Sequence, residues 1–276
     1  MRAAVIGLGL IGGSAALALR EAGHEVWGCD ASAKNAEKAR ELGLADRIVS
    51  TEAATRADLI IAAVPVDAAT VLVPEILNRC SRGQTVMDLG STKAALVNAV
   101  KGHPHRGRFV ACHPMAGTEF SGPEAALPDL FTGKFAVVCN REESDADALK
   151  TAEAVLAEWG MKTVYYGAEV HDMHAAFVSH ISHITSFALA LTVLDKEKND
   201  KDIFRLAAGG FTSTVRLAKS APHTWVPIFK QNKKYLLDVL EAQTEKLRLL
   251  KEAIESEDDT GLFNLIREAN EIKRIL

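Results

Sequence analysis

The sequence contains few cysteines and little excess charge, and these shortages exclude several classes of protein. Among 276 residues there are four cysteines, Cys29, Cys80, Cys112 and Cys139, and no two of them form a CxxC pair. Cysteines spaced so widely indicate neither a zinc site nor a thiol redox motif, and they are typical of a reducing compartment. We therefore expect a cytoplasmic protein that uses no metal ion.

A strong basic excess is also missing, since the formal net charge is -4. Proteins that bind nucleic acid usually gather positive charge on one face. The sequence therefore indicates a small-molecule partner and no nucleic acid. An anionic substrate remains compatible with it, because a binding site needs only a local cluster of positive groups.

Long uninterrupted apolar segments are scarce as well. Residues 3–19 are uncharged and follow Arg2, which imitates a secretory signal, but four glycines interrupt them in the order of a strand followed by a glycine turn. Elsewhere, apolar runs fall short of the roughly 20 residues that a membrane span requires. We expect neither a targeting segment nor a membrane anchor.

The first 167 residues alternate between strand-like and helix-like segments. This alternation predicts a parallel sheet covered by helices, an α/β domain of the Rossmann type that binds a dinucleotide. Helices are predicted at 12–22, at 33–42 with Ser32 as N-cap, and at 145–159. Strands are predicted at 2–6, 25–29, 58–64, 85–89, 109–112, 135–139 and 162–165.

Residues 168–276 are helical almost throughout. The segment 181–194 is apolar nearly all round, and such a helix is normally buried. The segment 235–254 is amphipathic. A helical unit of this size buries an all-apolar helix most readily against a second copy of itself, so we expect an all-α dimerisation domain and a homodimer.

A glycine turn follows the first predicted strand. Its sequence, Gly7-Leu8-Gly9-Leu10-Ile11-Gly12, has the GxGxxG spacing, and a helix is predicted after it. In this context the glycines allow a tight turn, close approach of the backbone to a pyrophosphate, and close packing of helix on strand. The exposed N–H groups at the start of the helix favour the anion.

Asp30 ends the next predicted strand and indicates which dinucleotide binds. A carboxylate there accepts hydrogen bonds from the adenosine ribose and repels a 2′-phosphate. The residues that follow, Ala31 and Ser32, supply no arginine for such a phosphate. We therefore expect NAD in preference to NADP.

Three strand exits carry unusual residues where the nicotinamide is expected to lie, because open parallel sheets bind ligands at the carboxyl ends of their strands. They are Val64-Pro65, Ser91 and His113. Oxidising an alcohol requires a group that accepts the hydroxyl proton, and histidine has a suitable pKa. We predict that His113 is this base and that Ser91 orients it or shares the hydroxyl contact. The pair His180 and His183 is interpreted as lining a polar cleft, since further metal ligands at suitable spacing are missing.

Together these motifs resemble one family. GLGLIGGS, DLGSTK, HPMAGTEFSG, SHISH and GGFTSTVRLAKSAPHTW occur in the order and spacing of the prephenate dehydrogenases of tyrosine biosynthesis. The resemblance implies NAD-dependent oxidative decarboxylation of prephenate to 4-hydroxyphenylpyruvate. The family also includes enzymes that convert arogenate to tyrosine, and the sequence does not choose between the two substrates.

The resemblance also implies roles for single residues. His113 matches the catalytic histidine and Ser91 its partner on the hydroxyl side, while His183 matches a histidine near the substrate side chain. Arg216 matches an arginine that binds a substrate carboxylate and reaches in from the other subunit. Thr212 departs from the pattern, because some relatives have lysine there. Further pocket positions are matched by Thr118, Glu119 and Trp225.

Two other functions compete with this interpretation. Dehydrogenases of the β-hydroxyacid type also join a Rossmann domain to a helical unit, but they generally rely on a lysine in the helical part, where this chain has SHISH. A protein that senses NAD without catalysis would bind the cofactor without turnover, and His113 would then be replaceable.

Overall fold

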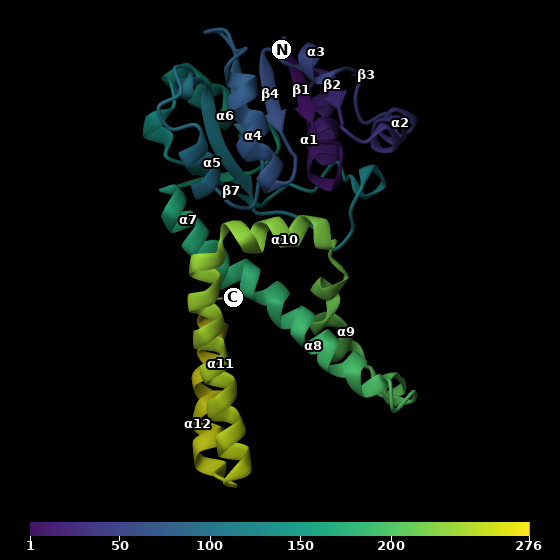
Figure 1. Cartoon of the computed structure of the whole chain (residues 1–276), viewed down its shortest axis with the longest axis vertical. Helices are drawn as coiled ribbons and strands as arrows, with labels where there is room; N and C mark the ends of the chain where they lie inside the picture. The colour runs from purple at the N-terminus through teal and green to yellow at the C-terminus, as the bar shows by residue number, and fades with distance from the viewer. Residues whose placement is uncertain (276) are drawn as a thin grey trace.

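The computed structural model describes residues 1–275, which form a sheet domain followed by a helical arm (Figure 1). The sheet has eight strands in the order β3-β2-β1-β4-β5-β6-β7-β8. Their bounds are β1 Arg2–Ile6, β2 Glu25–Cys29, β3 Arg47–Ile48, β4 Leu59–Ala62, β5 Thr85–Asp88, β6 Phe109–Pro114, β7 Phe135–Cys139 and β8 Lys162–Tyr166.

The prediction of a parallel sheet is confirmed for β1 to β6 and wrong for the last two strands. β7 runs antiparallel to β6 and parallel to β8. A parallel return requires a crossover connection, usually a helix, whereas residues 115–134 between β6 and β7 form a loop with a short 3-10 turn, η2 (Pro123–Ala125). Pairing with β7 extends β6 beyond its predicted end, so that His113 lies inside the strand, opposite Val137.

Helices cover both faces of the sheet, and the alternation of side chains along each strand divides the core in two. On β1, Ala3 and Val5 face the core beneath α1 and α6, while Ala4 and Ile6 face the core beneath α4 and α5. Ser32 caps α2 as predicted, since its Oγ accepts a hydrogen bond from the Asn35 N–H at 3.3 Å. The helices are α1 Leu10–Glu21, α2 Ala33–Glu41, α3 Thr51–Ala54, α4 Val66–Leu77, α5 Ala94–Ala99 and α6 Ala146–Glu158.

After β8 the chain is helical to the end of the described residues. A continuous rod consists of α7 (Ala168–Ala175), the π-helical turn η4 (Ala176–His180) and α8 (Ile181–Glu197). Figure 1 shows α10 lying across the lower edge of the sheet, with α11 and α12 extending away from it. The remaining elements are η5 Ile203–Leu206, α9 Gly209–Thr214, η6 Arg216–Lys219, α10 Pro222–Gln231, α11 Lys233–Glu255, α12 Asp259–Ala269 and η7 Asn270–Arg274.

The apolar helix α8 is largely open to solvent in a single chain. Leu191 is 63% exposed and Leu194 is 48% exposed, whereas Ser186 is buried. By length and composition alone, the continuous helix Ala168–Glu197 is long and apolar enough to cross a membrane. Only 11% of its most apolar 18-residue stretch is buried within the single chain, so most of that surface is uncovered. A helix whose apolar side chains are covered by a second protein chain has the same composition as a membrane-spanning helix. The exposed apolar surface of α8 therefore agrees with the predicted dimer.

Candidate active site

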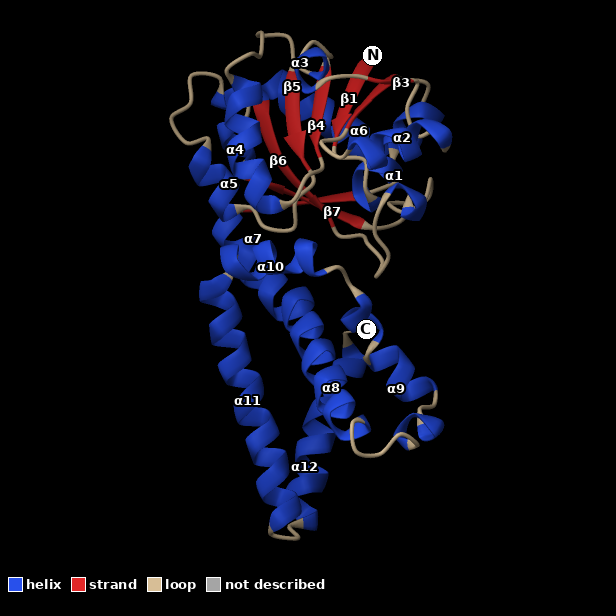
Figure 2. Ribbon diagram, turned by 45° about the vertical axis from the view of Figure 1, so that its right-hand side comes forward, coloured by secondary structure: helices blue, strands red, loops and turns tan. Residues whose placement is uncertain are grey.

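The predicted site residues gather where the carboxyl ends of the central strands meet the helical arm. Figure 2 shows β4, β5 and β6 ending above α7 and α10. Gln231 at the end of α10 holds this junction together, because its Oε1 accepts a hydrogen bond from Thr92 Oγ1 at 2.7 Å and its Nε2 donates to the carbonyl oxygen of Val66 at 2.9 Å. Thr92 follows β5 and Val66 follows β4, so one side chain fixes two strand exits to the arm.

The glycine turn between β1 and α1 leaves room for a ligand at the backbone. Gly7 has φ +94°, a conformation that favours glycine, and a Cβ on Gly12 would overlap the carbonyl oxygen of Gly7. A Cβ on Gly9 would meet none of the described atoms within 4 Å. Leu10 and Ile11 begin α1 here, so free N–H groups face the open side of the turn.

Asp30 lies beside this turn at the end of β2. Its two carboxylate oxygens accept hydrogen bonds from the backbone N–H groups of Leu8 and Ser32, each at 2.8 Å. These bonds aim the carboxylate along the rim of the turn and leave further lone pairs available, because a carboxylate accepts about four hydrogen bonds. Glycine turn, helix start and carboxylate therefore fit the diphosphate and ribose of a dinucleotide.

His113 is buried near the end of β6, with 8% of its surface exposed. Its Nδ1 lies 2.8 Å from Nε2 of His171. Burial lowers the pKa of His113 well below 6.5, and the nearby Lys93 ammonium lowers it further. The ring partner of His113 at Nδ1 is therefore His171. A role of Ser91 in orienting His113 or in contacting the substrate hydroxyl stays a prediction.

A buried ion pair anchors the strand end that carries His113. Lys93 and Asp88 form this pair, and they are 0% and 1% exposed. Lys93 Nζ also donates to the carbonyl oxygen of Cys112 at 2.6 Å, while Asp88 Oδ1 accepts a hydrogen bond from the Cys112 N–H at 3.2 Å. Because Cys112 immediately precedes His113, the pair fixes the backbone at the base of the histidine.

Helix α7 contributes two buried polar residues that sequence reasoning missed, His171 and Asp172, each 3% exposed. His171 Nδ1 lies 2.7 Å from Asp172 Oδ1. In the sequence they are 58 and 59 positions beyond His113, within a segment predicted only as helical. A polar pair in the first turns of a helix that follows the sheet was the available signal.

The two histidines of the SHISH segment occupy different environments. His180 is 1% exposed, and its Nδ1 lies 2.9 Å from Asn232 Nδ2. Burial lowers the pKa of His180 to about 4. His183 is half-buried and stacks on Trp225, with ring centroids 3.4 Å apart, while its Nδ1 donates to the carbonyl oxygen of Ser179 at 3.1 Å.

The loop after β6 meets the segment after α9 through an ion pair. Arg216 Nη1 lies 2.7 Å from Glu119 Oε2, and the Arg216 side chain is 50% exposed. The pKa of Glu119 is lowered, mainly by a hydrogen bond from its own backbone N–H and next by the hydrogen bond from the Arg216 guanidinium. This contact lies within one chain, whereas the sequence predicts that Arg216 serves the active site of the partner subunit. Thr118, one residue before Glu119, accepts a hydrogen bond from the Phe120 N–H at 3.2 Å.

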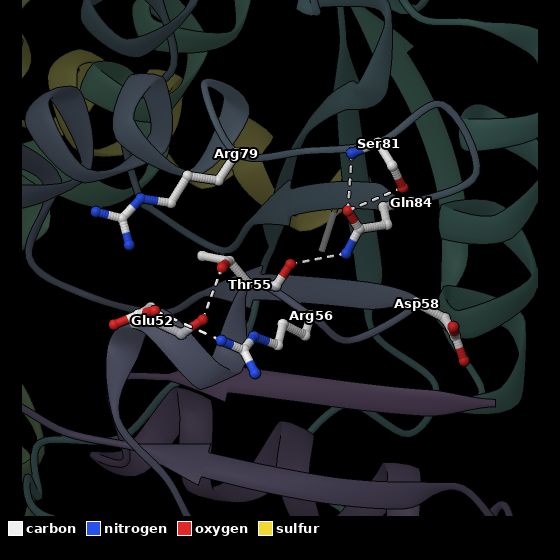
Figure 3. Close-up of a pocket in the computed structure, with 7 residues that line it drawn as sticks. All are labelled: Glu52, Thr55, Arg56, Asp58, Arg79, Ser81 and Gln84. Atoms are coloured by element: carbon white, nitrogen blue, oxygen red, sulfur yellow. Dashed lines mark hydrogen bonds and ion pairs between the residues drawn. The ribbon is translucent and has the colours of Figure 1, made fainter.

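The hollow drawn in Figure 3 lies at the opposite edge of the sheet, before β4 and β5 begin. Gln84 fills one side of it, and its Nε2 donates to the carbonyl oxygens of Thr55 and Ala57 at 2.8 and 2.6 Å. Arg56 pairs with Glu52 at 3.5 Å. This hollow contains none of the residues predicted for the site. Across residues 1–275, groups of three or more side chains suited to a metal ion are also missing.

Known proteins resemble the chain over nearly its whole length. The family "Prephenate dehydrogenase, nucleotide-binding domain" matches residues 15–165, and "Prephenate dehydrogenase, dimerization domain" matches residues 167–268. The prephenate dehydrogenase of Bacillus subtilis is 32% identical over 97% of this chain and 74% of its own length. The cyclohexadienyl dehydrogenase of Zymomonas mobilis is 31% identical over 99% of this chain and 95% of its own length.

Solved structures give the same result. The prephenate dehydrogenase of A. aeolicus, solved with hydroxyphenyl propionate and NAD+, superposes with a TM-score of 0.89 at 32% identity. The match covers 100% of this chain and 97% of that one. The similarity therefore includes both the sheet domain and the helical arm.

Proposed function

Because the chain belongs to the prephenate dehydrogenase family, we propose that it oxidises prephenate with NAD and releases carbon dioxide and 4-hydroxyphenylpyruvate, a step of tyrosine biosynthesis. The observation that carries this function is the position of His113. A buried histidine with a lowered pKa lies near the carboxyl end of β6, at the same edge of the sheet as the glycine turn after β1 that fits a dinucleotide. Family membership also leaves the β-hydroxyacid alternative without support.

His113 is the group that accepts the proton of the substrate's C4 hydroxyl. Its ring is neutral at physiological pH because burial lowers its pKa, so a nitrogen lone pair is available. Ser91, at the exit of β5, shares the hydroxyl contact. Bound NAD supplies the acceptor for the hydride that leaves C4. As the C1 carboxylate departs as carbon dioxide, the electrons of that bond enter the ring and make it aromatic, and the C4 oxygen takes the proton back from His113 to give the phenol.

Substrate carboxylates are held by residues of the loop and the arm. The Arg216 guanidinium binds a carboxylate through two parallel hydrogen bonds, which a lysine cannot do. Its present partner Glu119 occupies the position of such a carboxylate, 2.7 Å away. His183 and Trp225 form an aromatic wall beside it, and Thr118 offers a hydroxyl from the same loop. Thr212 supplies no second positive charge.

The match to the family's dimerisation domain supports a homodimer. An experiment with mixed dimers shows which subunit supplies Arg216 to each active site. Our sequence-based proposal is that Arg216 serves the partner's site. Dimers that combine one His113→Asn chain with one Arg216→Ala chain would then contain one intact site and regain activity. If Arg216 serves its own chain, as its contact with Glu119 suggests, both sites of the mixed dimer are defective and activity is not regained.

The central test replaces His113 by Asn. We expect kcat to fall by about 10²-fold or more, because general-base assistance is lost, while the affinity for NAD stays nearly unchanged. Arg216→Ala should mainly raise KM, since it removes binding that is present before the chemical step. Full activity of His113→Asn would contradict the mechanism, and an unchanged KM in Arg216→Ala would remove Arg216 from the site.

Substrate and cofactor preference are tested by comparing initial rates with prephenate and arogenate, each with NAD and NADP. We expect NAD to be preferred, because Asp30 stands where a 2′-phosphate would lie. Prephenate is the proposed substrate and arogenate the alternative, which Glu119 would favour through its attraction for an amine. We further propose that the chain divides into domains at residue 167, between β8 and α7, and that it works in the cytoplasm, where its four free cysteines stay reduced.

A further inference from the structure

A line of three buried side chains runs behind the active site. Asp172 Oδ1 lies 2.7 Å from His171 Nδ1, and His171 Nε2 lies 2.8 Å from His113 Nδ1. All three residues are at least nine-tenths buried. His171 and Asp172 belong to α7 of the helical arm, whereas His113 belongs to the sheet, so the line connects the two parts of the molecule.

The end of this line is an ionised carboxylate. Asp172 Oδ1 accepts a hydrogen bond from the Lys93 N–H at 2.8 Å, and Oδ2 accepts one from the Ala94 N–H at 2.9 Å. Hydrogen bonds donated by backbone N–H groups favour the charged form of a carboxyl group. A carboxylate can only accept hydrogen bonds. The proton between Asp172 and His171 therefore belongs to His171 Nδ1.

The remaining protons follow from this one. A neutral imidazole carries one proton, so His171 with a proton on Nδ1 has a bare Nε2 that can only accept. The proton between the two rings then belongs to His113 Nδ1. We infer that His171 and Asp172 are positioning residues that hold His113 in the tautomer with the proton on Nδ1 and the lone pair on Nε2.

The opposite arrangement is disfavoured. For His113 to accept at Nδ1, His171 would have to carry two protons and a positive charge while 3% exposed. Burying a charged ring costs free energy that a neutral ring avoids. The neutral arrangement satisfies every hydrogen bond along the line.

This tautomer is the one that the proposed reaction requires. The substrate's hydroxyl proton passes to His113 Nε2, which becomes an imidazolium, while the Nδ1 proton stays where it is. Asp172 remains ionised throughout, and its negative charge lies one ring away from the new positive charge. This inference rests on the proposed role of His113, but the tautomer itself can be measured without any turnover.

Asp172 also fixes the tautomer of a second histidine, His180, through Asn232, and this tautomer is the opposite of that of His113. Asn232 Nδ2 donates to the Asp172 carbonyl oxygen at 2.7 Å and to His180 Nδ1 at 2.9 Å. Turning the Asn232 amide round would place two oxygens against each other, so the assignment of its nitrogen is fixed. His180 must then carry its proton on Nε2. The junction thus prepares a proton acceptor at His113 and a hydrogen-bond donor at His180.

The direct test is nitrogen NMR of the full-length protein labelled with ¹⁵N-histidine. Long-range proton–nitrogen spectra distinguish a protonated ring nitrogen from a bare one, and the spectrum of His113→Asn identifies the His113 signals. We expect the wild-type protein to show a protonated Nδ1 and a bare Nε2 at neutral pH. A protonated Nε2 with a bare Nδ1 would overturn the inference, whatever the activity of the enzyme.

Two variants of His171 supply a kinetic test. Glutamine can place its carbonyl oxygen where Nε2 of His171 lies and still accept from His113, whereas leucine cannot. We expect kcat to fall by about 10²-fold in His171→Leu and to recover several-fold in His171→Gln, with little change in KM. Equal losses of kcat in both variants would contradict the role of His171. His105→Leu, which removes a half-buried ring bonded to the Leu77 carbonyl oxygen far from the site, is the matched control and should keep its kcat.

Asp172→Asn tests the carboxylate. Its amide has one oxygen and one NH2 group in place of two oxygens. With the NH2 group facing His171, His171 must carry its proton on Nε2, which forces His113 into the wrong tautomer. We expect kcat to fall by about 10²-fold or more, as for an aspartate that fixes a catalytic histidine, and the His113 NMR signals to exchange. Unchanged His113 signals in a folded variant would refute the role of Asp172. If instead His113→Asn is fully active, the proposed function fails while the wild-type spectrum still judges the inference.

Discussion

Replacing Lys93 by methionine tests whether the buried ion pair holds the floor of the active site. Methionine has a similar length but no charge, so Asp88 would be left in the core with the Gly90 N–H at 2.9 Å and the Cys112 N–H at 3.2 Å as its remaining donors. The Cys112 carbonyl oxygen would also lose the Lys93 ammonium, which lies 2.6 Å away.

The expected cost follows from the complete burial of both partners. Lys93 is 0% exposed and Asp88 is 1% exposed, so water cannot replace the missing partner. Breaking a buried ion pair on one side typically lowers the free energy of unfolding by about 3–5 kcal/mol. For a chain of this size, that corresponds to a fall in Tm of roughly 10 °C.

The assay is urea denaturation of wild type and variant, followed by circular dichroism at equal chain concentration because the stability of a dimer depends on it. Lys38→Met is the matched control. Lys38 forms an exposed pair with Glu41 at 2.9 Å, and such pairs contribute little, so its midpoint should hardly move. The double variant Asp88→Asn/Lys93→Met removes the stranded charge and should be more stable than Lys93→Met alone. If Lys93→Met unfolds at the wild-type midpoint, the buried pair does not stabilise the fold and the reasoning is refuted.

Two further predictions concern the cofactor and pH. Gly12→Ala should raise the Kd for NAD at least about tenfold, because the added Cβ overlaps the Gly7 carbonyl oxygen. A calorimetric titration measures the Kd, with Gly83→Ala in an open loop as the control. An unchanged Kd in Gly12→Ala would contradict the assignment of this turn to NAD. Since burial holds the pKa of His113 well below 6.5, kcat should stay constant from about pH 7.5 to about pH 6, and a loss of activity with an apparent pKa near 6.5 would be incompatible with a buried base. The same lowered pKa means that, below about pH 6.5, the unfolded chain binds a proton that the native chain does not, so this histidine makes the free energy of unfolding fall with falling pH until its native pKa is reached.

Local pattern predicted most of the fold. The alternation of apolar strands and helices located seven of the eight strands and the glycine turn, because side-chain period and turn chemistry are properties of neighbouring residues. It missed β3, which has two residues and therefore shows no period. It also predicted the wrong direction for β7 and β8, because strand direction depends on how residues 115–134 return to the sheet.

The candidate site was predicted only in part for the same reason. His113 was recognised because a histidine directly after an apolar run is unusual in the sequence alone. Its partner His171 was not, because a polar pair in the first turns of a helix is a weak signal until the packing of that helix shows what the side chains contact. Lys93 and Asp88 stood within a noticed motif, but their burial and pairing could not be inferred from it.

The sequence by itself determined the elements, the dinucleotide turn, the acidic residue beside it and the histidine at the strand end, since each of these depends on a few adjacent residues. Only the tertiary structure decided which groups share protons with that histidine. Packing α7 against the end of β6 brings Asp172, His171 and His113 into one line, and hydrogen bonds form only between groups within about 3 Å in good alignment. The identity of the base is therefore a property of the sequence, whereas its proton arrangement is a property of the fold.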